Sequence, residues 1–215
     1  MENYKKNLEL LTKNHVYSKE MEHDACGVGL IASTEGKKSR AIVEYGIEAL
    51  KAVWHRGAVD ADGKTGDGAG IHVEIPKDFF IEKIQVTGHD YDNSEICVGM
   101  IFLPRNDYSA QESCKTIVES ELTKNNFSIY GWRQVPVNSK VLGEKALQTM
   151  PEIIQVLFKP NDPNLLDKNL ERKIYEIRKR IENKAFDASL NNFYICSISS
   201  KSIIYKGLYL AESLS

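Results

Sequence analysis

Apolar residues recur at helical spacing in three parts of the chain. Four of them fall on one helical face between positions 39 and 54, namely Val43, Ile47, Leu50 and Trp54. We therefore predict a helix here, capped at its start by Ser39 and stopped by Gly57.

A second helix is predicted from the capping box Ser109-Ala-Gln-Glu112 to about Lys124. The third and longest covers residues 164–185, where Glu176 and Arg180 have the spacing of a supportive ion pair. The buried stripe of this long helix is predicted to be Leu170, Ile174, Ile177 and Ile181.

Strands are predicted where apolar residues alternate or form short continuous runs. The predicted strands cover residues 26–33, 71–75, 96–103, 127–137, 152–159, 193–199 and 202–208. The last two are expected to form a hairpin that turns at Ser200-Lys201. Because successive strands are joined by hairpins or single helices, the pattern favours an α+β fold with mainly antiparallel sheets covered by helices.

A loop rich in glycine and aspartate fills residues 56–70 and invites a phosphate- or calcium-binding interpretation. Five residues separate Gly57 from Gly63-Lys64-Thr65, whereas a phosphate-binding loop has four. The run from Gly66 is GxGxG and lacks the spacing of a dinucleotide-binding loop. A calcium loop starting at Asp60 would need glycine where Thr65 stands. We therefore predict a structural loop.

Composition and motif spacing argue against a nucleic-acid-binding, a membrane-spanning or a metal-binding protein. Charged residues make up 27% and the net charge is −2, so there is no basic excess for nucleic acid. No apolar run reaches the roughly 18 residues of a membrane span, so no membrane partner is expected. The five histidines form no metal-binding motif, and no metal site is expected. Residues 1–25 resemble neither a secretory signal nor a transit peptide and are either a frayed terminus or a removed segment.

Four cysteines are spaced too widely for a zinc or redox motif. We expect free thiols in a reducing compartment and place the protein in the cytoplasm. Cys97, Cys114 and Cys196 lie within apolar segments and are predicted to be core residues. Cys26 differs because it begins a predicted strand directly after the polar leader.

A cut between Ala25 and Cys26 would make Cys26 the first residue of the chain. Its free α-amine, with an ordinary pKa of about 7.7–8, could then accept the proton of its own thiol. One residue would supply both nucleophile and base, and no histidine partner would be needed.

Several motifs together strongly resemble the glutaminase domain of the glutamate synthases, a class II (N-terminal nucleophile) amidotransferase family. The resemblance covers about residue 20 to the last residue. Its motifs are His23-Asp-Ala-Cys-Gly-Val-Gly29, His55-Arg-Gly-Ala58, Gly66-Asp-Gly-Ala-Gly70, Gly131-Trp-Arg-Gln-Val-Pro136 and Tyr205-Lys-Gly207.

The resemblance implies that Cys26 attacks the side-chain amide of L-glutamine, forms a thioester and releases ammonia. It implies that Arg56 and Gly57 shape the site beside this nucleophile. Residues 1–25 would be a propeptide, and residues 26–215 would be part of the amidotransferase domain. The implied fold is a four-layer αββα sandwich of the N-terminal nucleophile hydrolases, here incomplete.

For the complete family enzyme, the resemblance implies that ammonia passes to downstream synthase domains of the same chain. There it would react with 2-oxoglutarate, and reduction would give a second glutamate. FMN and an iron–sulfur cluster would serve that half, with NADPH or ferredoxin as electron donor and a small reductase subunit as a further partner. No cofactor is expected within these 215 residues.

The family's Asn-Gly pair for the oxyanion and its Arg-x-Ser-Thr segment for the substrate carboxylate are both missing from this sequence. In the family both follow the Tyr-Lys-Gly segment, so we expect them beyond Ser215 and expect the 215 residues alone to be nearly inactive. Two alternatives stay open, which are another class II amidotransferase and a non-catalytic domain that binds a small ligand.

Overall fold

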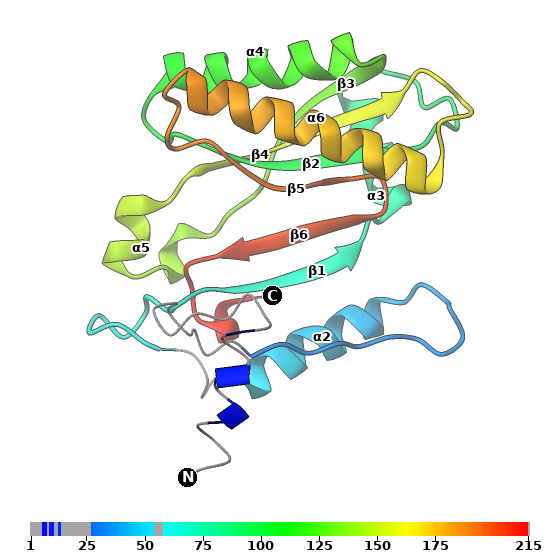
Figure 1. Ribbon diagram of the computed structural model, residues 1–215. Helices are drawn as coiled ribbons and strands as arrows, with labels where there is room; N and C mark the ends of the chain where they lie inside the picture. Colours follow the sequence, from blue (N-terminus) through cyan, green and yellow to red (C-terminus); the bar gives the residue numbers. More distant parts are fainter. Residues whose placement is uncertain (1–5, 8, 11–12, 14–26, 54–57, 215) are drawn as a thin grey trace.

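The computed structural model describes residues 6–7, 9–10, 13, 27–53 and 58–214. Within these ranges the fold is α+β, and every pairing between named strands is antiparallel, as the sequence predicts. The strands form one sheet of four and one of two (Figure 1).

The four-stranded sheet has the order β3-β4-β2-β5. Its strands are β2 (Cys97–Leu103), β3 (Phe127–Gln134), β4 (Glu152–Pro160) and β5 (Tyr194–Ser199). Strand β2 lies between β4 and β5 and is buried on both faces. This burial explains why its sequence is a continuous apolar run with no polar alternation.

Helices α4 (Tyr108–Lys124) and α6 (Asp167–Asp187) lie together over one face of this sheet (Figure 1). The predicted stripe of α6 is confirmed, since Leu170, Ile174, Ile177 and Ile181 are each at most 1% exposed. They pack in one hydrophobic cluster with residues from α4 and from all four strands.

The other face of the sheet meets the two-stranded sheet and helix α3 (Lys77–Val86). That second sheet pairs β1 (Ala69–Glu74) with β6 (Ser202–Gly207). A second hydrophobic cluster joins Val98 and Met100 of β2 to Phe80 of α3 and Ile203 of β6. Helix α3 is not predicted by the sequence pattern, because its short apolar run is interrupted by charged residues.

Helix α2 (Arg40–Ala52) contacts β1 on the side away from α4 and α6 (Figure 1). The predicted cap is confirmed, because the Ser39 hydroxyl accepts a hydrogen bond from the Ala41 N–H at 3.2 Å. No residue of α2 is buried. The short helix α5 (Glu144–Thr149) lies between β3 and β4 in the chain and is also not predicted by the sequence pattern.

The predicted hairpin of residues 193–208 is wrong in its pairing. The chain does turn at Ser200-Lys201, but β5 pairs with β2 whereas β6 pairs with β1. Side chains take the place of ladder bonds between them, since the Ser197 hydroxyl accepts from Ile204 N–H at 3.1 Å. The turn thus carries the chain from one sheet to the other.

Three local predictions also need correction. Residues 27–32 are exposed and form no strand, and none of the described strands pairs with them. The cap of α4 is Asp107 and not Ser109, since the Asp107 carboxylate accepts from Ala110 N–H at 2.9 Å. Glu176 pairs at 3.3 Å with Arg172, one turn before it in the helix, and not with Arg180, one turn after it. No helix in the described ranges is long and apolar enough to cross a bilayer.

Candidate functional site

The three predicted site residues, Cys26, Arg56 and Gly57, lie outside the described residues. The structure does describe the segments joined to them in the chain. Gly27 follows Cys26, helix α2 precedes Arg56, and Ala58 follows Gly57. The local geometry around Ala58 is the part of the candidate site that the structure defines best.

Residues 58–67 form a small antiparallel hairpin. Val59 and Gly66 make an isolated bridge, and Asp60 N–H donates to the Thr65 carbonyl at 2.8 Å. At the base of the hairpin, Ala58 N–H donates to Oδ2 of Asp67 at 2.7 Å. The predicted structural loop is therefore a folded element with defined partners.

Asp62 organises the tip of this hairpin. Its carboxylate accepts the Thr65 hydroxyl at 2.6 Å and the N–H groups of Thr65 and Lys64 at 2.7 and 2.9 Å. These hydrogen bonds, led by the Thr65 hydroxyl, lower the pKa of Asp62 to about 2. Asp62 is therefore a carboxylate at neutral pH and is fully used inside the turn.

The hairpin is braced against two other parts of the protein. Asp60 forms an ion pair with Lys145 of α5 at 2.5 Å, and this bond lowers the pKa of Asp60. A Cβ atom on Gly143 would lie 2.6 Å from the backbone nitrogen of Thr65, so a side chain at this position would force the hairpin away. A Cβ atom on Gly66 would lie 3.1 Å from the Tyr209 carbonyl oxygen.

This arrangement does not suit a phosphate. An anion-binding loop offers free backbone N–H groups, whereas Ala58, Asp60, Lys64 and Thr65 donate theirs within the hairpin or to its own carboxylates. The aspartates at positions 60, 62 and 67 would also repel a phosphate. From the sequence these aspartates were considered only as ligands, although Asp62 and Lys64 have the two-residue spacing of an aspartate side-chain turn.

The other three cysteines are confirmed as buried free thiols. Burial raises the pKa of Cys97 well above its ordinary value, raises that of Cys114 to about 11, and raises that of Cys196. A thiol attacks as its thiolate, so none of these three is suited to act as a nucleophile near neutral pH.

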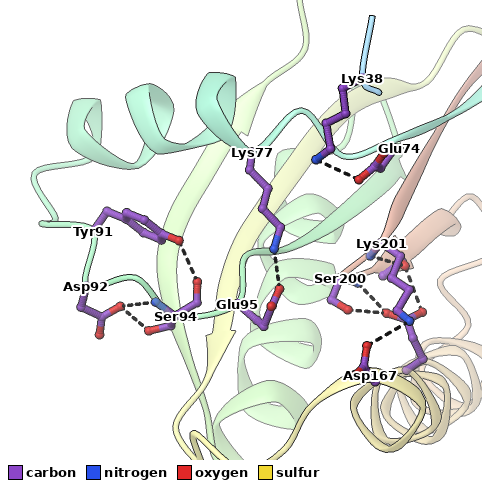
Figure 2. A network of polar contacts seen from close by, with 12 residues as sticks. Lys38, Glu74, Lys77, Tyr91, Asp92, Ser94, Glu95, Asp167, Ser200 and Lys201 are labelled. Atoms are coloured by element: carbon purple, nitrogen blue, oxygen red, sulfur yellow. Dashed lines mark hydrogen bonds and ion pairs between the residues drawn. The ribbon is translucent and has the colours of Figure 1, made fainter. Parts of the chain in front are cut away.

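A polar network lies on a different side of the fold (Figure 2). A hollow of about 400 Å³ there is lined by residues of β1, α3 and α6 and of the turns beside them, and five of these eight residues are charged. Each lining charge has a partner, since Lys77 pairs with Glu95 at 2.8 Å and Lys201 with Asp167 at 3.3 Å, while Glu74 binds Lys38 at 2.8 Å. The Glu95 carboxylate raises the pKa of Lys77. No charge of this hollow is left to attract a ligand.

The family model of the class-II glutamine amidotransferases matches residues 26–215. The chain belongs to this family. The match begins at Cys26 and includes the hairpin, both sheets and the described helices from α2 onward.

The curated proteins to which the chain is similar include glutamate synthases. The chain is 53% identical over 98% of its length to the glutamate synthase [NADPH] large chain of Azospirillum brasilense. It is 38% identical over 90% of its length to ferredoxin-dependent glutamate synthase 1, chloroplastic/mitochondrial, of Arabidopsis thaliana, and 39% identical over the same share to the chloroplastic enzyme of Spinacia oleracea. The chain spans 14% of the first relative's length and 12% of the other two.

Within this amidotransferase domain the described histidines bind hydroxyl groups. Nε2 of His72 lies 2.7 Å from the Ser202 hydroxyl, and Nδ1 of His89 lies 3.2 Å from the Thr87 hydroxyl. Among the described residues no three His, Cys, Asp or Glu side chains gather as metal ligands.

Proposed function

We propose that this chain is the glutaminase part of a glutamate synthase and hydrolyses L-glutamine to glutamate and ammonia. The observation that carries the proposal is the family match over residues 26–215, which begins at the one cysteine that sequence reasoning singled out. The glutamate synthase names of its relatives support the choice within the family.

In the proposed reaction, Cys26 is the first residue after removal of residues 1–25. Its Sγ attacks the side-chain amide carbon of glutamine while its α-amine takes the thiol proton. The carbon–nitrogen bond then breaks, the α-amine returns the proton, and ammonia leaves. Water hydrolyses the resulting γ-glutamyl thioester, which frees glutamate and restores the thiol.

Arg56 and Gly57 are proposed to shape the substrate site beside Cys26. We assign no residue among 1–215 as the oxyanion donor or as the group that binds the substrate carboxylate. Both of the family's motifs for these roles are missing from the sequence. The proposed architecture is the αββα sandwich of the N-terminal nucleophile hydrolases. The observed packing supports it, because α4 and α6 cover one sheet and α2 contacts the other.

The ammonia is proposed to pass to synthase domains that make glutamate from 2-oxoglutarate. FMN and an iron–sulfur cluster, when bound, would supply electrons for that reduction from NADPH or ferredoxin. The described residues do not fit an iron–sulfur cluster, which needs several cysteine ligands together, because no such group of ligands is present among them. No step of the glutaminase reaction depends on these groups.

The test is the intact mass and glutaminase activity of the natural full-length polypeptide, beside the variants Cys26→Ala and Cys196→Ala. We expect the unmutated protein to lack residues 1–25 and to release ammonia from glutamine. Cys26→Ala should abolish the release, because the nucleophile is gone, whereas Cys196→Ala should keep it because Cys196 is a buried core thiol.

A retained leader, or activity that survives in Cys26→Ala, would contradict the proposal. A different class II amidotransferase would be indicated if glutamine were hydrolysed but no glutamate formed from 2-oxoglutarate with a reductant present. A non-catalytic domain would be indicated if the leader stayed and no glutamine were consumed.

A further inference from the structure

The fully buried side chain of Gln155 on β4 joins the two sheets through polar contacts. Its Oε1 accepts a hydrogen bond from Nη1 of Arg133, its neighbour on β3, at 2.8 Å. Its Nε2 donates to the hydroxyl oxygen of Tyr205 on β6 at 3.4 Å. Because a guanidinium group only donates, the amide oxygen must face Arg133, which turns the amide nitrogen to Tyr205. These three side chains form a polar bridge from the four-stranded sheet to the two-stranded sheet.

The polar bridge crosses an interface that is made mainly of apolar side chains. The cluster between the sheets consists of aliphatic, aromatic and sulfur-containing residues. Gln155 is 0% exposed, so water cannot replace either of its partners. The Arg133 guanidinium also lies over the ring of Phe79 on α3, 5.1 Å from the ring centroid. Arg133 is therefore held by α3 as well as by Gln155.

The polar bridge reaches β6 from a different strand than its other polar contacts with the large sheet. Among the described residues, those contacts come from β5. The Ser197 hydroxyl accepts from Ile204 N–H at 3.1 Å, and Nζ of Lys206 donates to the Tyr194 hydroxyl at 2.7 Å. In the sheet, β2 separates β4 from β5. Contacts along β5 alone would let β6 rotate about that strand, whereas the contact from β4 opposes this rotation.

We propose that the polar bridge of Arg133, Gln155 and Tyr205 is an orientation lock, which sets the angle of the two-stranded sheet against the four-stranded sheet. Hydrogen bonds have preferred directions and apolar contacts do not, so one buried bridge can select a single orientation. This role does not depend on the glutaminase chemistry. It gives a shared task to the Gly131–Pro136 and Tyr205–Gly207 motifs, since Arg133 belongs to the first and Tyr205 to the second.

The test is hydrogen exchange followed by peptide mass spectrometry on the natural full-length polypeptide. Gln155→Met keeps the length of the side chain and removes both hydrogen bonds, whereas Tyr205→Phe removes only the contact between the sheets. The matched control is Gln111→Met on α4. Gln111 is also buried and donates to the Pro104 carbonyl at 2.7 Å, but α4 covers the face of the large sheet that is turned away from β1 and β6.

We expect the β1 and β6 peptides of Gln155→Met to exchange at least about tenfold faster than in the unmutated protein, because local opening of the small sheet becomes easier. The β2 and β4 peptides should stay within about twofold. Tyr205→Phe should speed exchange of the β1 and β6 peptides by at least about threefold, since it removes the longer of the two hydrogen bonds. Gln111→Met should leave these peptides within about twofold.

Unchanged exchange of the β1 and β6 peptides in Gln155→Met would overturn the orientation lock. Equal acceleration of the β2 and β4 peptides would also overturn it, because Gln155 would then support the fold as a whole. The same holds if Gln111→Met accelerates β1 and β6 as strongly. If circular dichroism shows that Gln155→Met is unfolded, Tyr205→Phe decides by the same comparison of peptides, because it keeps the contact between Arg133 and Gln155.

Discussion

At the scale of single residues, the absence of a side chain decides how closely β1 and β6 approach. A Cβ atom on Gly70 would lie 2.7 Å from Cβ of Lys206 and 2.8 Å from the Tyr205 carbonyl oxygen. Both are parts of the neighbouring strand that cannot rotate away. Gly70 is thus a condition of the pairing between β1 and β6.

We predict that Gly70→Ala lowers the free energy of unfolding by about 1–3 kcal/mol, because the two strands must separate to admit the methyl group. Urea denaturation of the polypeptide measures this change. The matched control is Gly29→Ala, since a Cβ there meets nothing within 4 Å and should change stability by less than about 0.5 kcal/mol. Equal effects of the two variants would contradict the prediction.

Some features of the candidate site can be predicted from the sequence, and others are seen only in the structure. The chemistry of an N-terminal thiol and the motifs around it point to Cys26, Arg56 and Gly57, and these roles stay predictions. The core character of the other three cysteines follows from apolar periodicity and is confirmed. The link between Ala58 and Asp67 depends on how a hairpin closes, which local pattern does not encode.

At the scale of elements, the turn between β5 and β6 is held by a residue from a helix. Glu171 of α6 accepts hydrogen bonds from the Ser199 hydroxyl at 2.9 Å and from the Ser200 N–H and hydroxyl, both at 2.7 Å. The turn where the chain changes sheets is therefore fastened to the helix layer.

We predict that Glu171→Ala lowers the free energy of unfolding by about 1–3 kcal/mol, because it leaves partly buried donors without an acceptor. The control is Glu176→Ala on the same helix, whose exposed pair with Arg172 should contribute less than about 0.5 kcal/mol. Thermal or urea unfolding measures both variants. A loss in Glu171→Ala no larger than the control's would show that the turn does not need this acceptor.

The elements also show where sequence patterns lose information. Periodicity predicts the long helix α6 and the buried strand β2, because each is apolar on the faces that pack. It could not assign β6 to its partner, since β5 and β6 have the alternation and short turn of an ordinary hairpin. The choice of β1 as partner arises from packing between sheets, which only the tertiary structure reveals.

At the scale of the whole molecule, burial is distributed unevenly. Helix α6 has five buried residues, whereas α2 has none. In the segment that precedes α2 in the chain, Val28 and Leu30 are 90% and 89% exposed. Local stability should follow this distribution, because segments with few buried contacts open more readily than core elements.

We predict that backbone amides of α2 exchange with deuterium at least about tenfold faster than those in the middle of α6. Hydrogen exchange followed by peptide mass spectrometry measures the difference. The peptides of α4, which also has buried residues, serve as an internal control and should resemble α6. Equal protection of α2 and α6 would show that α2 is held by contacts other than those described.

The buried cysteines can report local opening of the two hydrophobic clusters through the reactivity of their thiols. Cys97 and Cys114 belong to the cluster beneath α4 and α6, and Cys196 belongs to the cluster between the sheets. A disulfide reagent can reach such a thiol only when the packing around it opens. The modification rate of each cysteine therefore reports how often its hydrophobic cluster opens. The natural sequence can therefore reveal whether its two cores come apart together or in turn, without any engineered label.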